Sequence, residues 1–235
     1  MRTLKTTTGP FSERPYFTHE EIDHLSIAEL RAVGLYPDTP SPVRIERFIE
    51  KRFRLSPIYE DLPDDVLGYT RFGVDGVQAI VVSRTLSEDG TRVSEYRLST
   101  TLGHEAGHGL LHSYLFALSS QSQPLFNDDD VSPTKVLCRK QEVLGSTTKK
   151  RYDGRWWEYQ ANQCMSALLL PRPLVVECVR PFVRIEGMME IAVLSEGRRE
   201  QAVRHVAEVF KVNPVVARIR IAELYPEGSE RQMTL

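Results

Sequence analysis

The chain has 235 residues, of which 41% are hydrophobic and 26% are charged, values that are ordinary for a water-soluble folded protein. This length suffices for one large domain, or for a core with a small appendage. The formal net charge of −2 gives no global electrostatic argument for nucleic-acid binding, and the longest apolar stretches, such as Ala167 to Leu170, are far too short to span a bilayer.

The cysteine pattern and the first residues bear on the compartment. The three cysteines, Cys138, Cys164 and Cys178, are odd in number and widely spaced, which is typical of reduced thiols and not of a disulfide framework. The first fifteen residues contain no apolar segment of the kind found in signal peptides. We therefore expect a cytoplasmic protein without a membrane segment.

The first 60 residues predict an arm followed by two helices. Residues 1–16 are polar and contain two prolines, so we expect a loose arm. Thr18 and Glu21 have the spacing of a capping box, and the helix that they begin should end at Gly34. A second amphipathic helix is predicted to start at Pro42.

Three β-rich segments follow, at 66–71, 77–83 and 93–98, and glycine-containing turns separate them. They predict a small antiparallel sheet whose last strand leads directly into a helix with Ser99 at its N-cap. An edge strand of such a sheet could bind an extended peptide by adding it as a further strand.

The helix predicted after Ser99 carries His104, Glu105 and His108 in a His-Glu-x-x-His arrangement. Side chains four residues apart lie on one face of a helix, so both imidazoles can reach one metal ion. Glu105 lies one step round the helix, where it can act on a water and not on the ion itself. This pattern is typical of zinc hydrolases, with two ligands and a general base on one turn.

His112 extends the same face and is a candidate for a residue that supports the site or stabilises the oxyanion; tyrosines and arginines are the other candidates for the oxyanion donor. A third ligand of the metzincin type is excluded, because that pattern needs a histidine at 114 and a glycine at 111. These positions hold Tyr114 and Leu111.

A long polar stretch, residues 116–155, separates this motif from the next helical pattern. It contains the acidic run 127–130 and the basic run 149–151. The acidic run lacks the alternating ligands and the glycine of a calcium loop. We expect a solvated loop, with a lid over the site as the alternative.

A catalytic zinc site usually has a third protein ligand, and Glu158 is the best candidate. It stands in the first turn of a helical pattern that runs to Leu170. Because the helix dipole favours an acidic group at this position, an ordinary carboxylate at a helix start explains Glu158 equally well on the residues alone.

The C-terminal residues predict a helix at 201–211 and another at 215–224, with Pro214 between them, whereas 183–195 could be strand or helix. Helix, short turn and helix could form a DNA-binding unit with Arg218 and Arg220 as contacts. The turn has no glycine and acidic residues dilute the charge, so we expect the pair to support the core, without direct nucleic-acid binding.

HEAGHGLLH, followed some fifty residues later by WEYQANQCMSALLLPRP, resembles the ImmA/IrrE family of metallo-endopeptidases. The family pattern matches the chain at His104, Glu105, Gly107, His108 and His112, and again at Glu158, Ala161, Asn162, Leu169 and Pro171. The run from Cys164 to Ala167 departs from it. The resemblance covers roughly 65–180, and it implies that Glu158 is the third ligand.

The expected fold class is α/β (α+β). A zincin-like core at 61–182 would hold the small sheet, the His-Glu helix and a second ligand-bearing helix. An N-terminal arm and helices at 1–60 would pack on it, and 183–235 would form a C-terminal helical region.

We expect a zinc endopeptidase in which His104, His108 and Glu158 hold Zn²⁺ and Glu105 is the general base. The resemblance implies a single protein substrate, a repressor-like or antitoxin-like regulator, in stress response or mobile-element control. One alternative is a zinc-containing DNA-binding or protein-contact regulator without turnover. A weaker one is a deformylase-like amidase, which would need Cys138 or Cys164 as a ligand.

Overall fold

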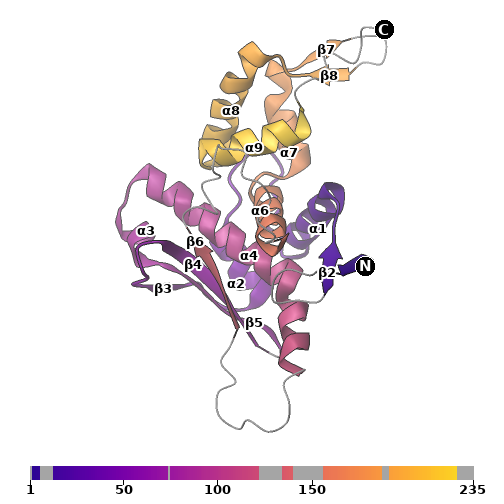
Figure 1. Ribbon diagram of the computed structural model, residues 1–235. Coiled ribbons are helices and arrows are strands. Elements are labelled where there is room, and N and C mark those ends of the chain that lie inside the picture. Colours follow the sequence, from indigo (N-terminus) through magenta and orange to yellow (C-terminus); the bar gives the residue numbers. More distant parts are fainter. Residues whose placement is uncertain are drawn as a thin grey trace.

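The computed structural model describes residues 2–5, 13–73, 75–121, 134–139, 156–186 and 191–226 (Figure 1). The elements in chain order are β1 (Arg2–Lys5), β2 (Glu13–Tyr16), α1 (His19–Ala32), α2 (Ile45–Phe53), β3 (Ile58–Glu60), β4 (Val66–Gly73), β5 (Gly76–Ser83), α3 (Arg84–Glu88), α4 (Arg92–Gln121), β6 (Thr134–Arg139), α6 (Trp156–Leu169), α7 (Arg172–Val179), the 3₁₀ turn η1 (Arg180–Phe182), β7 (Arg184–Glu186), β8 (Ile191–Val193), α8 (Glu196–Phe210) and α9 (Pro214–Leu224).

The long helix α4 lies at the centre of the molecule. Strands β4 and β5 pack on one side of it, α6 packs on another, and α1 covers α6 (Figure 1). Helices α7, α8 and α9 lie together beyond the end of α6, and β7 and β8 lie at the far end of this group (Figure 1). The fold is therefore a mixture of helices and a small sheet, as predicted at the level of α/β class.

The central sheet is mixed, with the strand order β3-β5-β4-β6. Strand β4 pairs antiparallel with β5 and β6, whereas β3 runs parallel to β5. Two of its strands lie where the sequence predicts them, but the expected all-antiparallel sheet is wrong. Gly76 begins β5 at φ +108°, a backbone conformation that residues other than glycine rarely adopt.

The prediction of a strand at 93–98 is wrong, because these residues form the first turns of α4, which has 30 residues. Thr91, and not Ser99, begins the helix: its hydroxyl accepts the N–H of Ser94 at 3.2 Å and its carbonyl accepts the N–H of Glu95. Val93 is 55% exposed, so the β-rich composition of this segment does not correspond to a buried strand.

The N-terminal residues differ in part from the prediction. Thr18 and Glu21 form the expected capping box of α1, and Gly34 follows the helix at φ +66°. Strands β1 and β2 pair antiparallel, so residues 2–5 and 13–16 are not a loose arm. Helix α2 begins at Ile45, three residues after the predicted start.

Two parts of the stretch 116–155 are not loop. Helix α4 continues to Gln121, and β6 pairs with β4 as an outer strand of the sheet. Its backbone finds hydrogen-bond partners along β4, a long-range pairing that local polarity does not reveal. The acidic run 127–130, the basic run 149–151 and the predicted lid lie outside the described residues.

Two glycines bring α4 close to α6. A Cβ on Gly107 would lie 2.8 Å from the backbone oxygen of Ala161 and 3.2 Å from the Cβ of Cys164. A Cβ on Gly103 would meet the side chains of Met165 and Leu169. Because neither glycine carries a side chain, the two helices approach closely enough for their polar side chains to meet.

The C-terminal elements share the main core. Its buried hydrophobic cluster includes residues from α1, α2, β5, α4 and α6 through α9. The ambiguous segment contains the short strands β7 and β8, and α8 begins at Glu196, before its predicted start. Within the described residues, no helix combines the length and apolarity needed to cross a membrane.

Candidate metal centre

Helix α4 places His104 and His108 one turn apart on one face, and both imidazoles are fully buried. Their rings meet edge to face, with centroids 4.7 Å apart, and their Nε2 atoms are 3.0 Å apart. Two histidine nitrogens therefore point to one place in the interior.

Helix α6 supplies the third group. The Oε2 atom of Glu158 lies 3.1 Å from Nε2 of His104 and 3.5 Å from Nε2 of His108. Glu158 is only 7% exposed, although it stands in the first turn of its helix. The close α4–α6 contact at Gly107 is what brings this carboxylate to the histidines.

These three side chains could hold one metal ion, and their ligand atoms all lie within 4.8 Å of one another. Ligand atoms about 2.0–2.1 Å from a tetrahedral ion lie about 3.3 Å apart. The observed separations of 3.0, 3.1 and 3.5 Å bracket this value. The donor set, two imidazoles and one carboxylate, also fits zinc chemistry.

The protonation states suit metal binding. Burial lowers the pKa of His108, although Glu158 opposes this shift, so its imidazole is held neutral. Burial by itself raises the pKa of Glu158, but the close contacts with His108 and His104 outweigh burial and hold this pKa below its ordinary value. A neutral imidazole and an ionised carboxylate are the forms that bind metal.

Asn162, one turn after Glu158 on α6, orients His104. Its Oδ1 lies 3.0 Å from Nδ1 of His104. When this Nδ1–H donates to the amide oxygen, Nε2 keeps its lone pair for a ligand.

His112 lies behind His108 and not beside the three ligand atoms. Its Nδ1 is 3.0 Å from Nδ1 of His108, and its Nε2 is 3.1 Å from Oε1 of Gln160. Burial lowers the pKa of His112 to about 3, so its imidazole is neutral. The rings of His112 and Trp156 meet edge to face, with their centroids 5.6 Å apart.

Glu105 faces the sheet side of the site. Its carboxylate is fully buried, and its Oε2 accepts a hydrogen bond of 2.6 Å from the hydroxyl of Thr70 on β4. The same hydroxyl lies 3.1 Å from the backbone oxygen of Glu105. Strand β4 therefore fixes the orientation of this side chain beside the histidines.

The structure brings together His104, His108 and Glu158. His112 contacts His108, and Glu105 is hydrogen-bonded to Thr70. Thr70, Asn162 and Gln160 are site residues that the sequence did not predict. The sequence did single out Asn162, because this residue matches a position of the family pattern. Thr70 and Gln160 had no such signal, since their roles depend on contacts of 2.6 Å and 3.1 Å with residues far away in the chain.

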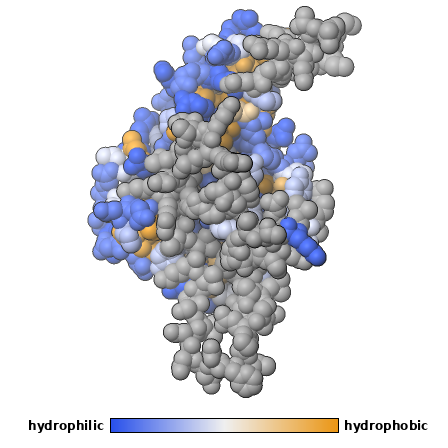
Figure 2. All heavy atoms as spheres, in the orientation of Figure 1, coloured by the Kyte–Doolittle hydropathy of each residue, from blue (hydrophilic) through white to orange (hydrophobic). Residues whose placement is uncertain are grey.

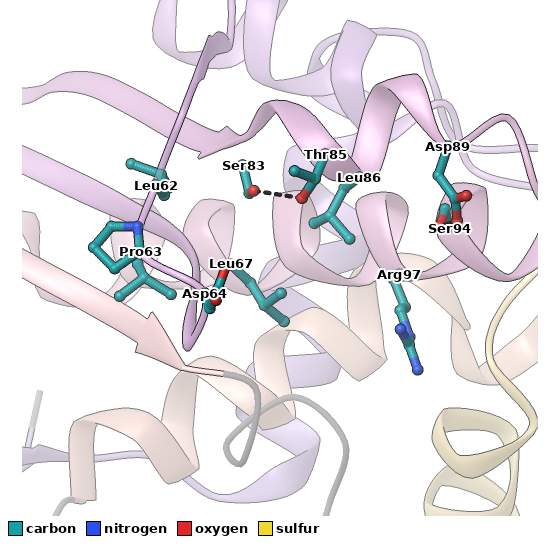
Figure 3. Close-up of a pocket in the computed structure, with 11 residues that line it drawn as sticks. Leu62, Pro63, Asp64, Leu67, Ser83, Thr85, Leu86, Asp89, Ser94 and Arg97 are labelled. Atoms are coloured by element: carbon teal, nitrogen blue, oxygen red, sulfur yellow. Dashed lines mark hydrogen bonds between the residues drawn. The ribbon is translucent and has the colours of Figure 1, made fainter.

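A separate hollow of about 360 Å³ lies near the start of α4 (Figure 3). Leu62, Leu67 and Leu86 form apolar walls, and the hydroxyls of Ser83 and Thr85 hydrogen-bond to each other at 2.8 Å. Arg97 also lines the hollow; this residue precedes His104 by seven positions, about 10 Å along the helix. None of the three metal-binding candidates lines this hollow.

The two alternative functions, DNA binding and a cysteine-ligated amidase, depend on arginines and cysteines outside this metal-binding group. Arg220 is 1% exposed and binds Asp23 and Glu223, and Arg218 pairs with Glu200 at 3.0 Å. Cys164 is buried, with its Sγ 3.8 Å from Oγ of Ser26, and it is not part of the metal-binding group. The side chain of Cys138 lies outside the described residues.

On the face shown in Figure 2, hydrophilic residues cover most of the described surface, and hydrophobic ones occur in small separate patches. Comparison with models of known families, with curated proteins and with solved structures gives no match for this chain.

Proposed function

We propose that this protein is a zinc-dependent endopeptidase that hydrolyses a peptide bond in a specific protein substrate. One observation carries the proposal: the Nε2 atoms of His104 and His108 and a carboxylate oxygen of Glu158 converge within 3.5 Å, and Glu105 lies on the adjacent position of α4. Two histidines and a glutamate are the ligand set of many zinc peptidases.

Zinc held by these three residues would lower the pKa of a water molecule and polarise the carbonyl of the scissile bond. Glu105 is the general base: an oxygen of its carboxylate takes a proton from the attacking water and then gives it to the leaving nitrogen. Thr70 keeps this carboxylate in place through its hydrogen bond to Oε2. Asn162 holds the ring of His104 in the orientation that presents Nε2.

The substrate proposal rests on the resemblance to the ImmA/IrrE family. Its members act on a repressor-like or antitoxin-like regulator, in stress response or mobile-element control, and we propose the same class here. Strand β6 is an outer strand of the sheet and pairs with β4, which carries Thr70. Its other edge could add an extended segment of the substrate as a further strand.

The test compares two bacterial cultures, one expressing the wild-type protein and the other Glu105→Gln. Mass spectrometry of all protein N-termini should find one or a few new termini with the wild type and none with the variant. Since Glu105→Gln keeps the ligands, it isolates turnover from metal binding. Identical sets of termini in the two cultures would contradict the proposal.

In the alternative, a DNA-binding regulator without turnover, Arg218 and Arg220 would contact DNA, but both are paired within the protein. Arg220 is buried in an ion-pair network and Arg218 is paired with Glu200. Salt-sensitive binding of duplex DNA that is unchanged in Glu105→Gln would restore this alternative.

A further inference from the structure

We propose that Gln160 is a positioning residue for the metal ligand His108, acting through His112, and that strand β2 is its anchor. This inference rests on the proposed metal site and adds the N-terminal strand pair to it. The chain of contacts runs from the carbonyl of Pro15 to Gln160, His112 and His108, all of them buried.

The contact with Pro15 determines which way the side-chain amide of Gln160 is turned. The Nε2 of Gln160 donates a hydrogen bond of 2.8 Å to the carbonyl oxygen of Pro15. If the amide were turned over, its own oxygen would face that carbonyl oxygen, and two acceptors would meet in a buried place. The Pro15 carbonyl therefore fixes the Gln160 oxygen on the side of His112.

The oxygen of Gln160 then selects the tautomer of His112. An acceptor 3.1 Å from Nε2 requires a proton on that nitrogen, so Nδ1 of neutral His112 carries a lone pair. This lone pair accepts the Nδ1–H of His108 at 3.0 Å. His108 in turn has its remaining lone pair on Nε2, the atom that faces His104 and Glu158.

The two ligand histidines are thus oriented in different ways. Asn162, on the same helix as Glu158, orients His104 in one step. The orientation of His108 needs three steps and ends on β2, which lies more than 140 positions from Gln160 in the sequence. Loss of the anchor should weaken the His108 ligand while the His104 ligand keeps its support.

The chain offers a matched control for Gln160. Gln163 lies three residues further on α6 and lines the same hollow of about 200 Å³ beside Pro15. It forms no hydrogen bond with any residue that the structure describes. Gln163→Met and Gln160→Met therefore each remove one side-chain amide from the same helix. Only Gln160→Met interrupts the series of hydrogen bonds from Pro15 to His108.

The first measurement is zinc affinity, by competition with a chromophoric chelator. Gln160→Met should bind zinc about 10–100-fold more weakly than the wild type, the usual effect of removing a residue that orients a ligand. Gln163→Met should match the wild type. Equal affinities of Gln160→Met and Gln163→Met would overturn the inference.

The second measurement needs neither metal nor variant. Nitrogen-15 NMR of the histidine rings in the metal-free wild type should show His112 protonated at Nε2 and His108 protonated at Nδ1. A proton on Nδ1 of His112 would overturn the inference, even in a protein that binds zinc well. A wild type with these tautomers that binds no zinc would refute the proposed function and leave the hydrogen-bond chain standing.

Discussion

At the scale of single residues, the site depends on hydrogen bonds between buried polar groups. Thr70 and Glu105 are fully buried, and a hydrogen bond to a buried carboxylate is worth more than a neutral one. The imidazoles of His104 and His108 each have a partner at Nδ1, so the ring orientations do not depend on a bound ion.

Removal of the Thr70 hydroxyl should therefore be costly. Thr70→Val keeps the shape of the side chain but leaves the Glu105 carboxylate without this donor. We expect a loss of about 1–3 kcal/mol in the free energy of unfolding, measured with urea.

Thr101→Val is the matched control. The Thr101 hydroxyl is also buried but has no hydrogen-bond partner among the residues that the structure describes, so its removal should be neutral or stabilising. Equal losses in the two variants would show that the Thr70 contact contributes nothing specific.

Because of Cys164, the free energy of unfolding should fall as the pH rises above 9. Burial raises the pKa of its thiol from 9.0 to about 12. The folded state therefore resists ionisation, and the contribution of the thiol to stability is complete below pH 9 and is lost as the pH rises toward 12. The loss approaches about 1.4 kcal/mol for each pH unit in that window.

Urea unfolding under reducing conditions measures this effect. Between pH 9 and pH 10.5, the wild type should lose about 2 kcal/mol relative to Cys164→Ala, which cannot titrate at this position. Parallel stability profiles of the two proteins over that range would refute the assignment.

At the scale of helices and strands, the close contact of α4 with α6 forms the site. The backbone oxygen of Ala161 lies 2.8 Å from the position of a Cβ on Gly107, so a side chain there would push α6, and Glu158 with it, away from the histidines. The glycine of the motif is thus explained by helix packing.

Gly107→Ala should lower the free energy of unfolding by about 1–3 kcal/mol and weaken zinc binding. In Gly197→Ala the new Cβ would meet nothing within 4 Å, so this variant should keep its zinc affinity and gain up to about 1 kcal/mol. Calorimetry and zinc titration of both variants make the comparison. A Gly107→Ala protein with unchanged zinc affinity would contradict the packing argument.

The sequence predicted the elements that local signals define. The Thr18 capping box, the helical spacing of His104 and His108, and the strands β4 and β5 could all be derived from neighbouring residues. The start of α4 was misjudged because the β-rich composition of 93–98 is typical of a strand. Strand β6, the pairing of β1 with β2, and the roles of Thr70 and Gln160 depend on distant partners, which no local pattern reveals.

At the scale of the whole molecule, Arg220 connects three distant parts of the chain. From α9 it binds Asp23 on α1, Glu223 on its own helix and the carbonyl of Leu170 at the end of α6. Its side chain is 1% exposed, so the charges it neutralises have little access to water. The C-terminal helices are thus fastened to the same helix that carries Glu158.

Arg220→Met should lower the free energy of unfolding by about 3–5 kcal/mol, because it leaves the buried Asp23 carboxylate without its main partner. Arg218→Met, two positions earlier on α9, breaks only the exposed pair with Glu200 and should cost less than about 1 kcal/mol. Equal small losses in both variants, measured by urea unfolding, would refute the connecting role of Arg220.

The proposed zinc centre is tested most directly by the zinc content of the purified wild type, Glu105→Gln and Glu158→Ala. We predict one tightly bound zinc ion in the wild type and in Glu105→Gln, because the three ligands are intact in both, and much weaker binding in Glu158→Ala. Equal zinc in all three proteins would exclude Glu158 as a ligand. A folded wild type that takes up no added zinc would contradict the account as a whole.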